Sequence, residues 1–344
     1  MANFEPSIVI DTILSGEPTA VGVTNSSILR STSLSLARAL AIGSVAGWRP
    51  SGDYVEVWDP TIGEGGAASL LADALHAGGL TVAVRGQDID PRAVEISRQR
   101  LARHPQSDVE VGDTLIASSP PSGVSADLVI VDPPWGLDWR ELADPIKARH
   151  ERGEFRLGLP TRSDATWLFI ALALERLKSP DDGGGRVAAL VHKRLLSSSA
   201  QADDSVRKRL LASGSLESVV RLPEALAPHA AIPLYLMTFT NVRGGRRPGH
   251  AQLMDLRTGF THVKETRSMT REALAEIGNN LRVWKPSQRS RVLPYGQVPR
   301  SGVALRSFVG GVQAVSAGRS SAPISGSVLA TMLTRQRART SRPR

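Results

Sequence analysis

Short apolar runs alternate with helical patterns between residues 55 and 240, and this alternation restricts the fold more than any other feature. A strand, helix, strand rhythm is typical of a largely parallel sheet that helices cover on both faces. We therefore predict an α/β fold with a doubly wound, mostly parallel seven-stranded sheet. The predicted strands are Val55–Asp59, Val82–Asp88, Val109–Val111, Leu128–Asp132, Val187–His192, Leu216–Leu222 and Leu234–Thr240. The predicted helices between them cover residues 65–77, 91–103, 163–178 and 203–213.

The sheet domain is expected to cover residues 46–245, and an N-terminal helical segment, residues 1–45, precedes it. Within that segment we expect a helix at residues 24–42, for which Thr24 or Ser27 offers a side-chain N-cap. Open parallel sheets bind their ligands beyond the carboxyl ends of the strands. The motifs described below all fall at those ends, so we expect one site there.

Residues 246–344 are predicted to form a small basic extension of the sheet domain. It begins with a possible edge strand at Ala251–Leu256 and a helix at residues 270–281. Residues 281–344 carry 12 Arg and Lys and no Asp or Glu, which leaves a net −3 for the rest of a chain whose total is +9. We expect this tail to be partly disordered and solvated, with contact to nucleic-acid phosphates as the alternative.

Composition excludes several classes of function. No apolar run approaches the ~20 residues needed to span a bilayer, and the first residues do not have the pattern of a signal peptide. The chain contains no cysteine, which excludes disulfides, thiolate metal sites and cysteine nucleophiles and fits a cytoplasmic location. The histidines show no metal-ligand spacing, so His192 and the others are interpreted as surface or core residues.

A glycine-rich turn follows the first predicted strand and opens a helix. Its sequence runs from Asp59 and Pro60 through Gly63 and Gly65. Glycines let the backbone turn tightly and approach a ligand closely. An acidic residue at the end of the strand suits a cationic methionine moiety better than a pyrophosphate, which would prefer the helix N-terminus free of the acidic Glu64.

Two further acids end the next two predicted strands. Asp88 stands at the tip of the second strand, where a carboxylate can accept both hydroxyls of a ribose. Ile89 would then lie against an adenine ring, and Asp90 is interpreted as an ordinary helix N-cap. Asp113 follows the third strand, where it can accept from an adenine amino group. Three acids at three successive strand ends predict a nucleoside-containing cofactor.

The fourth predicted strand delivers Asp132, Pro133, Pro134 and Trp135 at its carboxyl end. The two prolines remove backbone donors and keep the chain extended, so this loop presents only acceptors. An acceptor pair of the Asp132 carboxylate and the Pro133 carbonyl fits a planar amino group, whose nitrogen it can orient and activate. Trp135 offers a face for stacking an extruded base. No metal is required by this chemistry.

At this point the chain resembles the amino-methyltransferases of DNA and, among them, the modification subunits of type I restriction–modification systems. The resemblance covers residues 24–285 and rests on the cofactor loop Asp59–Gly66, the segment Gly86–Asp90 and the catalytic loop Asp132–Trp135. It implies a sheet of the S-adenosylmethionine-dependent methyltransferase type, S-adenosylmethionine as cofactor, and methylation of adenine N6 in DNA. The family usually has Asn where Asp132 stands, and other amino-methyltransferases use Asp.

The long helical domain and the target-recognition domain of the family have no counterpart in the sequence, so a separate specificity or target-recognition subunit is expected as a partner. Methylation of cytosine N4, of RNA or of a protein amide is open as an alternative, because each offers a planar amino group to the same loop. A non-catalytic subunit that binds DNA or a partner is the alternative from another class.

Overall fold

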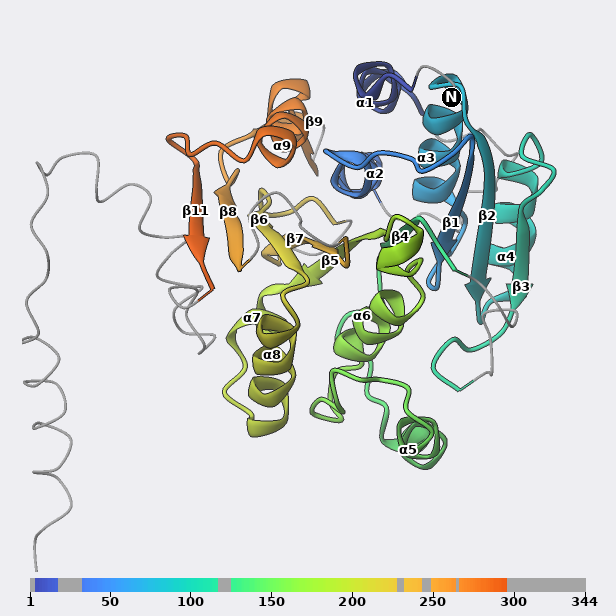
Figure 1. Ribbon diagram of the computed structural model, residues 1–344, viewed down its shortest axis with the longest axis vertical. Helices are drawn as coiled ribbons and strands as arrows, with labels where there is room; N and C mark the ends of the chain where they lie inside the picture. Colours follow the sequence, from blue (N-terminus) through green and yellow to red (C-terminus); the bar gives the residue numbers. More distant parts are fainter. Residues whose placement is uncertain are drawn as a thin grey trace, which may run out of the picture.

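A computed structural model describes residues 4–17, 33–116, 125–227, 232–242, 249–263 and 266–295. Within these residues a nine-stranded sheet runs through the molecule in the order β11-β8-β6-β7-β5-β4-β1-β2-β3, with helices on both faces (Figure 1). The fold is therefore the predicted doubly wound α/β sheet. The predicted number of seven strands was too low, because two further strands extend the sheet beyond β6.

The seven predicted strands are all present. Five consecutive strands, from β5 to β3 in sheet order, are paired in parallel, whereas β7 runs antiparallel to both of its neighbours. The strand bounds are β1 Tyr54–Asp59, β2 Thr81–Asp88, β3 Asp108–Val111, β4 Leu128–Val131, β5 Arg186–His192, β6 Leu216–Arg221 and β7 Leu234–Thr240.

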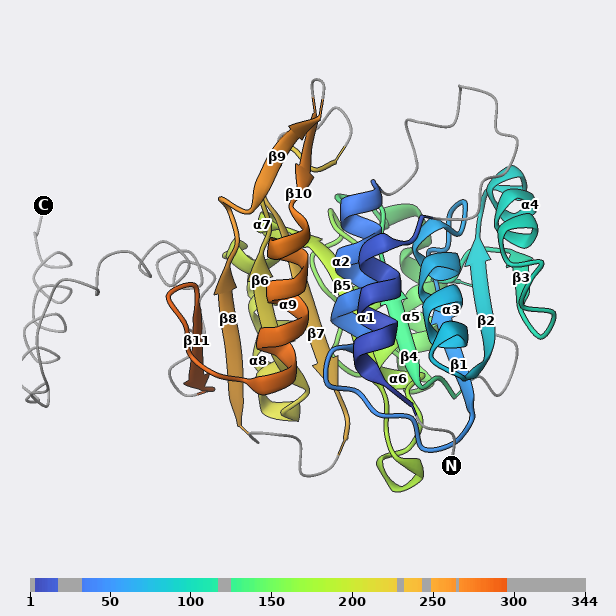
Figure 2. The same cartoon turned by 90° about the horizontal axis from the view of Figure 1, so that it is seen from above.

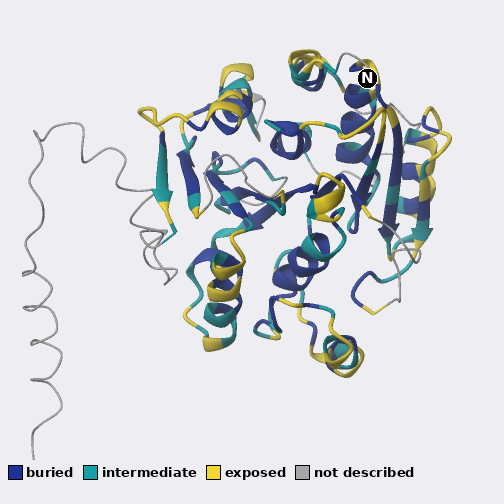
Figure 3. Cartoon of the chain, in the orientation of Figure 1, coloured by how far each residue is buried: buried dark blue, intermediate teal, exposed yellow. Residues whose placement is uncertain are grey.

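Two apolar layers enclose the sheet, and different helices supply each layer (Figure 3). Figure 2 shows α1, α2, α3 and α9 side by side over one face, and the other face is covered by α6, α7 and α8, with α5 joined to the same apolar layer. The helix bounds are α1 Pro6–Ser15, α2 Leu34–Val45, α3 Gly66–Ala77, α4 Pro91–Arg100, α5 Ala143–Glu151, α6 Thr166–Glu175, α7 Lys193–Ser197, α8 Gln201–Ser213 and α9 Arg271–Val283.

The helix predicted at residues 24–42 corresponds to α2, which begins later in the chain than predicted. α2 begins at Leu34, and Ser33 is its N-cap because the Ser33 hydroxyl accepts from the Leu36 amide. Thr24 and Ser27, the expected caps, lie outside the described residues. α2 continues to Val45, and ten of its twelve residues are buried because it packs between α3, α9 and the sheet.

The described part of the C-terminal extension is built into the sheet. β8 (His250–Asp255) pairs in parallel with β6, and β11 (Ser290–Pro294) pairs with β8. The strand predicted at Ala251–Leu256 is thus present, but it is not the edge, because β11 covers it. A hairpin of β9 (Phe260–Val263) and β10 (Thr266–Met269) precedes α9. The division into three segments stays a prediction, and most of the basic tail lies outside the described residues.

Two short 3₁₀ helices lie in connections: η1 (Arg140–Leu142) comes between β4 and α5, and η2 (Pro180–Asp182) comes between α6 and β5. Across the described ranges, none of the helices combines the length and apolar character that a bilayer-spanning helix requires.

Candidate active site

The order of the sheet places a ligand site at the ends of β1 and β4. From β1 the chain moves to β2 and β3 on one side, and then crosses to β4 on the other side of β1. Ligands in open α/β sheets bind at such a switch point, outside the carboxyl ends of the strands. Asp59 is the last residue of β1 and Asp132 directly follows β4. The sheet therefore brings the first residues of the two predicted loops to one place.

Thr61 joins the two loops directly. The Asp132 amide donates to the Thr61 hydroxyl oxygen at 3.1 Å. The Thr61 amide and hydroxyl both lie within hydrogen-bonding distance of Asp59 Oδ1, at 3.0 and 3.4 Å. The catalytic loop is thus fastened to the cofactor loop through one side chain, which sequence reasoning did not single out.

Asp59 is almost completely buried, with 5% of its surface exposed. Burial raises the pKa of Asp59 to about 8, against the hydrogen bonds from Thr61, and the carboxylates of Asp132 and Asp88 add to the rise. Asp59, Asp88 and Asp132 therefore lie near enough to interact. A buried acid with two acidic neighbours and a raised pKa is suited to a cationic ligand, which would favour its ionised form.

The second acid is held by the glycine-rich loop itself. The Gly63 amide donates to Asp88 Oδ2 at 3.0 Å, and the Asp90 amide donates to Oδ1 at 2.9 Å. A carboxylate offers about four lone-pair positions, so these bonds leave room for ribose hydroxyls. Ile89, next in the chain, exposes 71% of its surface, as expected of an apolar side chain that would cover a flat ring. Asp90 caps α4, as predicted.

The two glycines of the loop have different reasons to be glycine. Both adopt a positive φ, +51° at Gly63 and +75° at Gly65. A Cβ on Gly65 would lie 2.9 Å from Cβ of Ser97 in α4, so this glycine permits close helix packing. A Cβ on Gly63 would meet nothing nearer than the Thr61 carbonyl oxygen at 4.0 Å, so Gly63 faces open space. Of the two, only Gly63 lies where a ligand could approach the backbone.

The third predicted acid, Asp113, lies in the turn after β3. Its carboxylate accepts from the Leu115 amide at 2.9 Å. The next residue, Thr114, is buried, and its hydroxyl donates to the Pro60 carbonyl at 2.8 Å and lies 2.9 Å from Gln87 Oε1. The turn that carries Asp113 is therefore attached to the cofactor loop, and all the predicted cofactor residues lie around one group of strand ends.

The catalytic loop shows alternating exposure. Pro133 is buried, Pro134 is exposed, and Asp132 and Trp135 are partly buried. Among the described residues nothing donates to the Pro133 carbonyl, whereas the Pro134 carbonyl accepts from the Leu137 amide at 3.3 Å. Trp135 packs against the apolar layer of α1 to α3, and its buried indole nitrogen finds no hydrogen-bond partner among the described residues. The loop thus contains a carbonyl acceptor to which no described residue donates, at the position that the sequence predicts.

A buried acid–histidine pair supports the segment beyond the catalytic loop. His192, at the end of β5, has Nε2 2.7 Å from Asp164 Oδ2, and its Nδ1 accepts from the Arg194 amide. Burial alone would raise the pKa of Asp164, but hydrogen bonds from His192 and Thr166 outweigh it, and the pKa is lowered.

The segment that contains Asp164 forms backbone hydrogen bonds with the residues that follow the catalytic loop. The Ala165 amide donates to the Leu137 carbonyl at 2.9 Å, and the Trp139 amide donates to the Arg162 carbonyl at 2.9 Å. The interpretation of His192 as an ordinary core or surface residue therefore missed its role as a support. Asp164 lies 28 positions away, and no spacing in the sequence signals the pair.

A hollow of about 440 Å³ lies elsewhere, between α5 and α8, and none of the predicted site residues lines it. Its lining residues are His150, Leu159, Gln201, Ala202, Ser205 and Arg209. Its walls hold no acid and no part of the two loops, so we place the active site at the strand ends instead.

Comparison with known proteins identifies the family of the chain. The model of the N-6 DNA methylase family matches residues 46–293, which is more than half of the chain. The methylase subunit of the type I restriction enzyme HindI from Haemophilus influenzae is 24% identical over 241 residues, covering 67% of this chain and 51% of that protein.

Solved structures share the fold. The methyltransferase subunit of a type I restriction–modification system from Streptococcus thermophilus superposes with a TM-score of 0.67 at 18% identity, covering 80% of this chain and 56% of the other. A candidate class I S-adenosylmethionine-dependent methyltransferase from Listeria monocytogenes has a TM-score of 0.57 at 19% identity, covering 82% and 80%. The chain spans about half the length of the Haemophilus influenzae and Streptococcus thermophilus subunits.

Proposed function

Because the chain belongs to the N-6 DNA methylase family, we propose that it methylates the N6 amino group of adenine in DNA with S-adenosylmethionine as donor. One observation carries this proposal: the hydrogen bond from Asp132 to Thr61, which fixes the catalytic loop beside the acidic cofactor loop. The reacting amine and the methyl donor would be held by two loops that share one side chain.

The residues around the strand ends fit the proposed cofactor. When bound, S-adenosylmethionine supplies an electrophilic methyl group on a sulfonium. Asp59, whose pKa is raised to about 8, would ionise beside the positively charged methionine end. Asp88 would accept from the ribose hydroxyls, Asp113 from the adenine amino group, and Ile89 would cover the ring. Gly63, which faces open space, would let the backbone approach the cofactor.

The catalytic loop would activate the substrate amine. The Asp132 carboxylate and the free Pro133 carbonyl would each accept one N–H of the adenine amino group, so that the nitrogen lone pair turns toward the methyl group. The N–CH₃ bond would form as the S–CH₃ bond breaks, with S-adenosylhomocysteine as the leaving group. The nitrogen would become positively charged in this step, and it would then lose one of its protons to solvent while Asp132 and Pro133 hold it as hydrogen-bond acceptors. The adenine would have to leave the DNA stack to reach this loop, and Trp135 would stack on it.

The relatives suggest the biological setting. The matched proteins from Haemophilus influenzae and Streptococcus thermophilus are subunits of type I restriction systems, so we propose that this chain acts as a modification subunit together with a separate specificity or target-recognition subunit. That partner would select the DNA sequence in which this chain methylates adenine.

Expression in cells, with and without the neighbouring genes, tests the proposal. DNA from these cells is digested and its nucleosides are measured by mass spectrometry, with Asp132→Ala as the control. N6-methyladenine should appear with the wild-type chain and be absent with the variant. N4-methylcytosine in its place would assign a different base, and equal N6-methyladenine in both samples would contradict the proposal.

A further inference from the structure

One arginine of α5 is completely enclosed although that helix is rich in charged residues. Arg149 exposes 1% of its surface. Its Nε and Nη2 donate to the two carboxylate oxygens of Glu154, at 3.0 and 2.5 Å, and the guanidinium lies over the ring of Phe155. A buried arginine needs such a bidentate partner to offset its desolvation.

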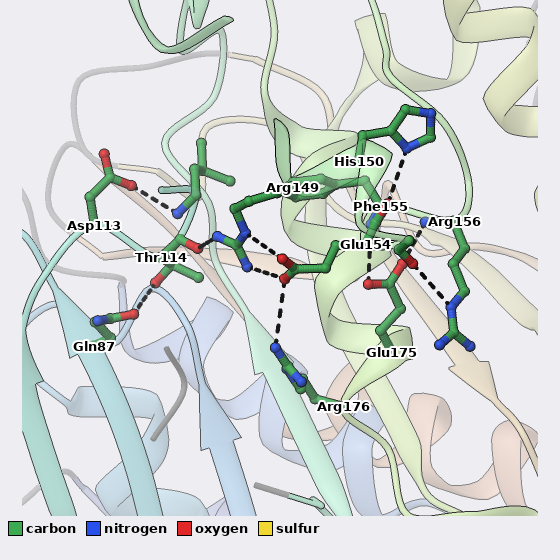
Figure 4. A network of polar contacts seen from close by, with 12 residues as sticks. Gln87, Asp113, Thr114, Arg149, His150, Glu154, Phe155, Arg156, Glu175 and Arg176 are labelled. Atoms are coloured by element: carbon green, nitrogen blue, oxygen red, sulfur yellow. Dashed lines mark hydrogen bonds and ion pairs between the residues drawn. The ribbon is translucent and has the colours of Figure 1, made fainter. Parts of the chain in front are cut away.

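The remaining Nη1 donor of Arg149 reaches across to the cofactor side. It donates to the main-chain carbonyl of Thr114 at 2.7 Å (Figure 4). Thr114 is the residue after Asp113, and its hydroxyl donates to the Pro60 carbonyl in the cofactor loop. Thr114 thus accepts a hydrogen bond from α5 and donates one to the loop that follows β1.

The turn at Asp113 makes few other backbone hydrogen bonds among the described residues. β3 is four residues long, lies at the edge of the sheet and pairs only with β2 among the described strands. Beyond the strand, the Gly112 amide donates to the Asp88 carbonyl, and the remaining backbone bond in the turn, from Ile116 to Asp113, is internal. Leu115 is buried in the apolar layer that includes α5 and α6, and Arg149 supplies the hydrogen bond from outside the β1 to β3 region that holds this turn and satisfies a buried carbonyl.

We propose that Arg149 is a positioning residue that holds the Asp113–Thr114 turn, and through it the adenine end of the cofactor pocket, in the binding geometry. This inference rests on the proposed cofactor. It also gives a second role to the segment between the catalytic loop and α6, because α5 follows Trp135 in the chain and returns to support the opposite side of the pocket.

The chain contains a matched control for this role. Arg186 at the start of β5 exposes 4% of its surface, donates to both carboxylate oxygens of Glu217 at 2.6 Å and also donates to a backbone carbonyl, that of Ala46. Arg186 lies at the amino end of its strand, whereas the candidate site lies at the carboxyl ends. Replacing it removes the same kinds of interaction as replacing Arg149, but far from the pocket.

The test compares R149M and R186M in the full-length chain. Affinity for S-adenosylhomocysteine is measured by calorimetry, thermal stability by unfolding, and opening of residues 111–116 by hydrogen exchange without ligand. We expect both variants to unfold at lower temperature. Only R149M should lose affinity, by about tenfold if the turn is correctly placed about one tenth of the time, and only R149M should speed exchange at residues 111–116.

A second variant removes the outer link and leaves the arginine pair intact. Thr114→Val deletes the hydroxyl that bonds Pro60, and we expect it to weaken binding as well, with the double variant weaker by less than the product of the two effects. If R149M does not fold, Thr114→Val still tests whether the attachment of this turn affects cofactor binding.

Unchanged affinity in R149M, an equal loss in R186M, or fully multiplicative effects would overturn the inference. A wild-type chain that binds no S-adenosylhomocysteine would count against the proposed function, and the exchange of residues 111–116 would still decide whether Arg149 holds the turn.

Discussion

Binding of a cationic cofactor should release a proton from Asp59. Its pKa of about 8 means that about 90% of Asp59 is protonated at pH 7, one unit lower. If the bound state requires the carboxylate, ionisation costs roughly 1.4 kcal/mol at pH 7. Affinity should then rise roughly 50-fold between pH 6 and pH 8 and level off above, because ionisation no longer opposes binding.

Calorimetry measures both parts of this expectation. Titrations at pH 7 in buffers of different ionisation enthalpy should show about 0.9 proton released for each molecule bound. Asp59→Asn is the control, because it cannot ionise and retains only the titration of the ligand's own amino group. A binding enthalpy that is independent of the buffer, or the same pH dependence in wild type and D59N, would refute the argument that burial keeps this acid neutral before binding.

The same pKa shift makes a prediction for the ligand-free protein. The folded chain holds a proton on Asp59 that the unfolded chain releases above its ordinary pKa of 3.8. The contribution of this group to stability should therefore fall as the pH rises from about 4 to about 8, and D59N should remove that fall. A chemical-denaturation series across this pH range, compared between the two proteins, measures the difference.

Further predictions concern the loops and the tail. Asp132→Ala should lower kcat for methylation by at least about 100-fold, whereas Asp132→Asn, which keeps an acceptor oxygen, should retain most activity in the same assay; equal loss in both would contradict the acceptor role. Thr61→Val should destabilise the fold by about 1 kcal/mol and lower kcat, and an unchanged kcat would show that the link between the loops is dispensable. His192→Ala should lower the free energy of unfolding by about 1.5–3 kcal/mol, and denaturation of the double variant with Asp164→Asn should show no further loss if the two act as a pair. If the basic tail contacts DNA phosphates, deletion of residues 296–344 should flatten the dependence of DNA affinity on salt; an identical slope would agree with a tail that is only solvated.

The central strands were predictable because a strand that is buried on both faces is apolar along its whole length. The run Leu128–Val131 is apolar throughout and fully buried, and an acid or a turn bounds each neighbouring run. The same logic placed Asp59, Asp88 and Asp132 at strand ends, since a charged side chain that ends an apolar run must leave the sheet there. Parallel pairing then brings these ends together without any further information.

The supporting contacts could not be predicted because they depend on tertiary structure. α5 has a weak apolar pattern, and its buried face includes an arginine whose sequence context favours exposure to solvent. Arg149 is buried only because Glu154 and the Thr114 carbonyl meet it, and Thr114 lies 35 positions away. β11 was missed for a similar reason: its residues Ser290–Pro294 mix polar and apolar side chains, and pairing with β8 makes them a strand.

A crystal structure of the chain with S-adenosylhomocysteine would show whether the two loops hold the cofactor and the substrate amine side by side. We expect the amino end of the ligand at Asp59, its ribose at Asp88 and its sulfur on the side of Asp132 and the Pro133 carbonyl, with space between for an amine. A ligand bound away from these strand ends, or a catalytic loop separated from the sulfur by other residues, would contradict it.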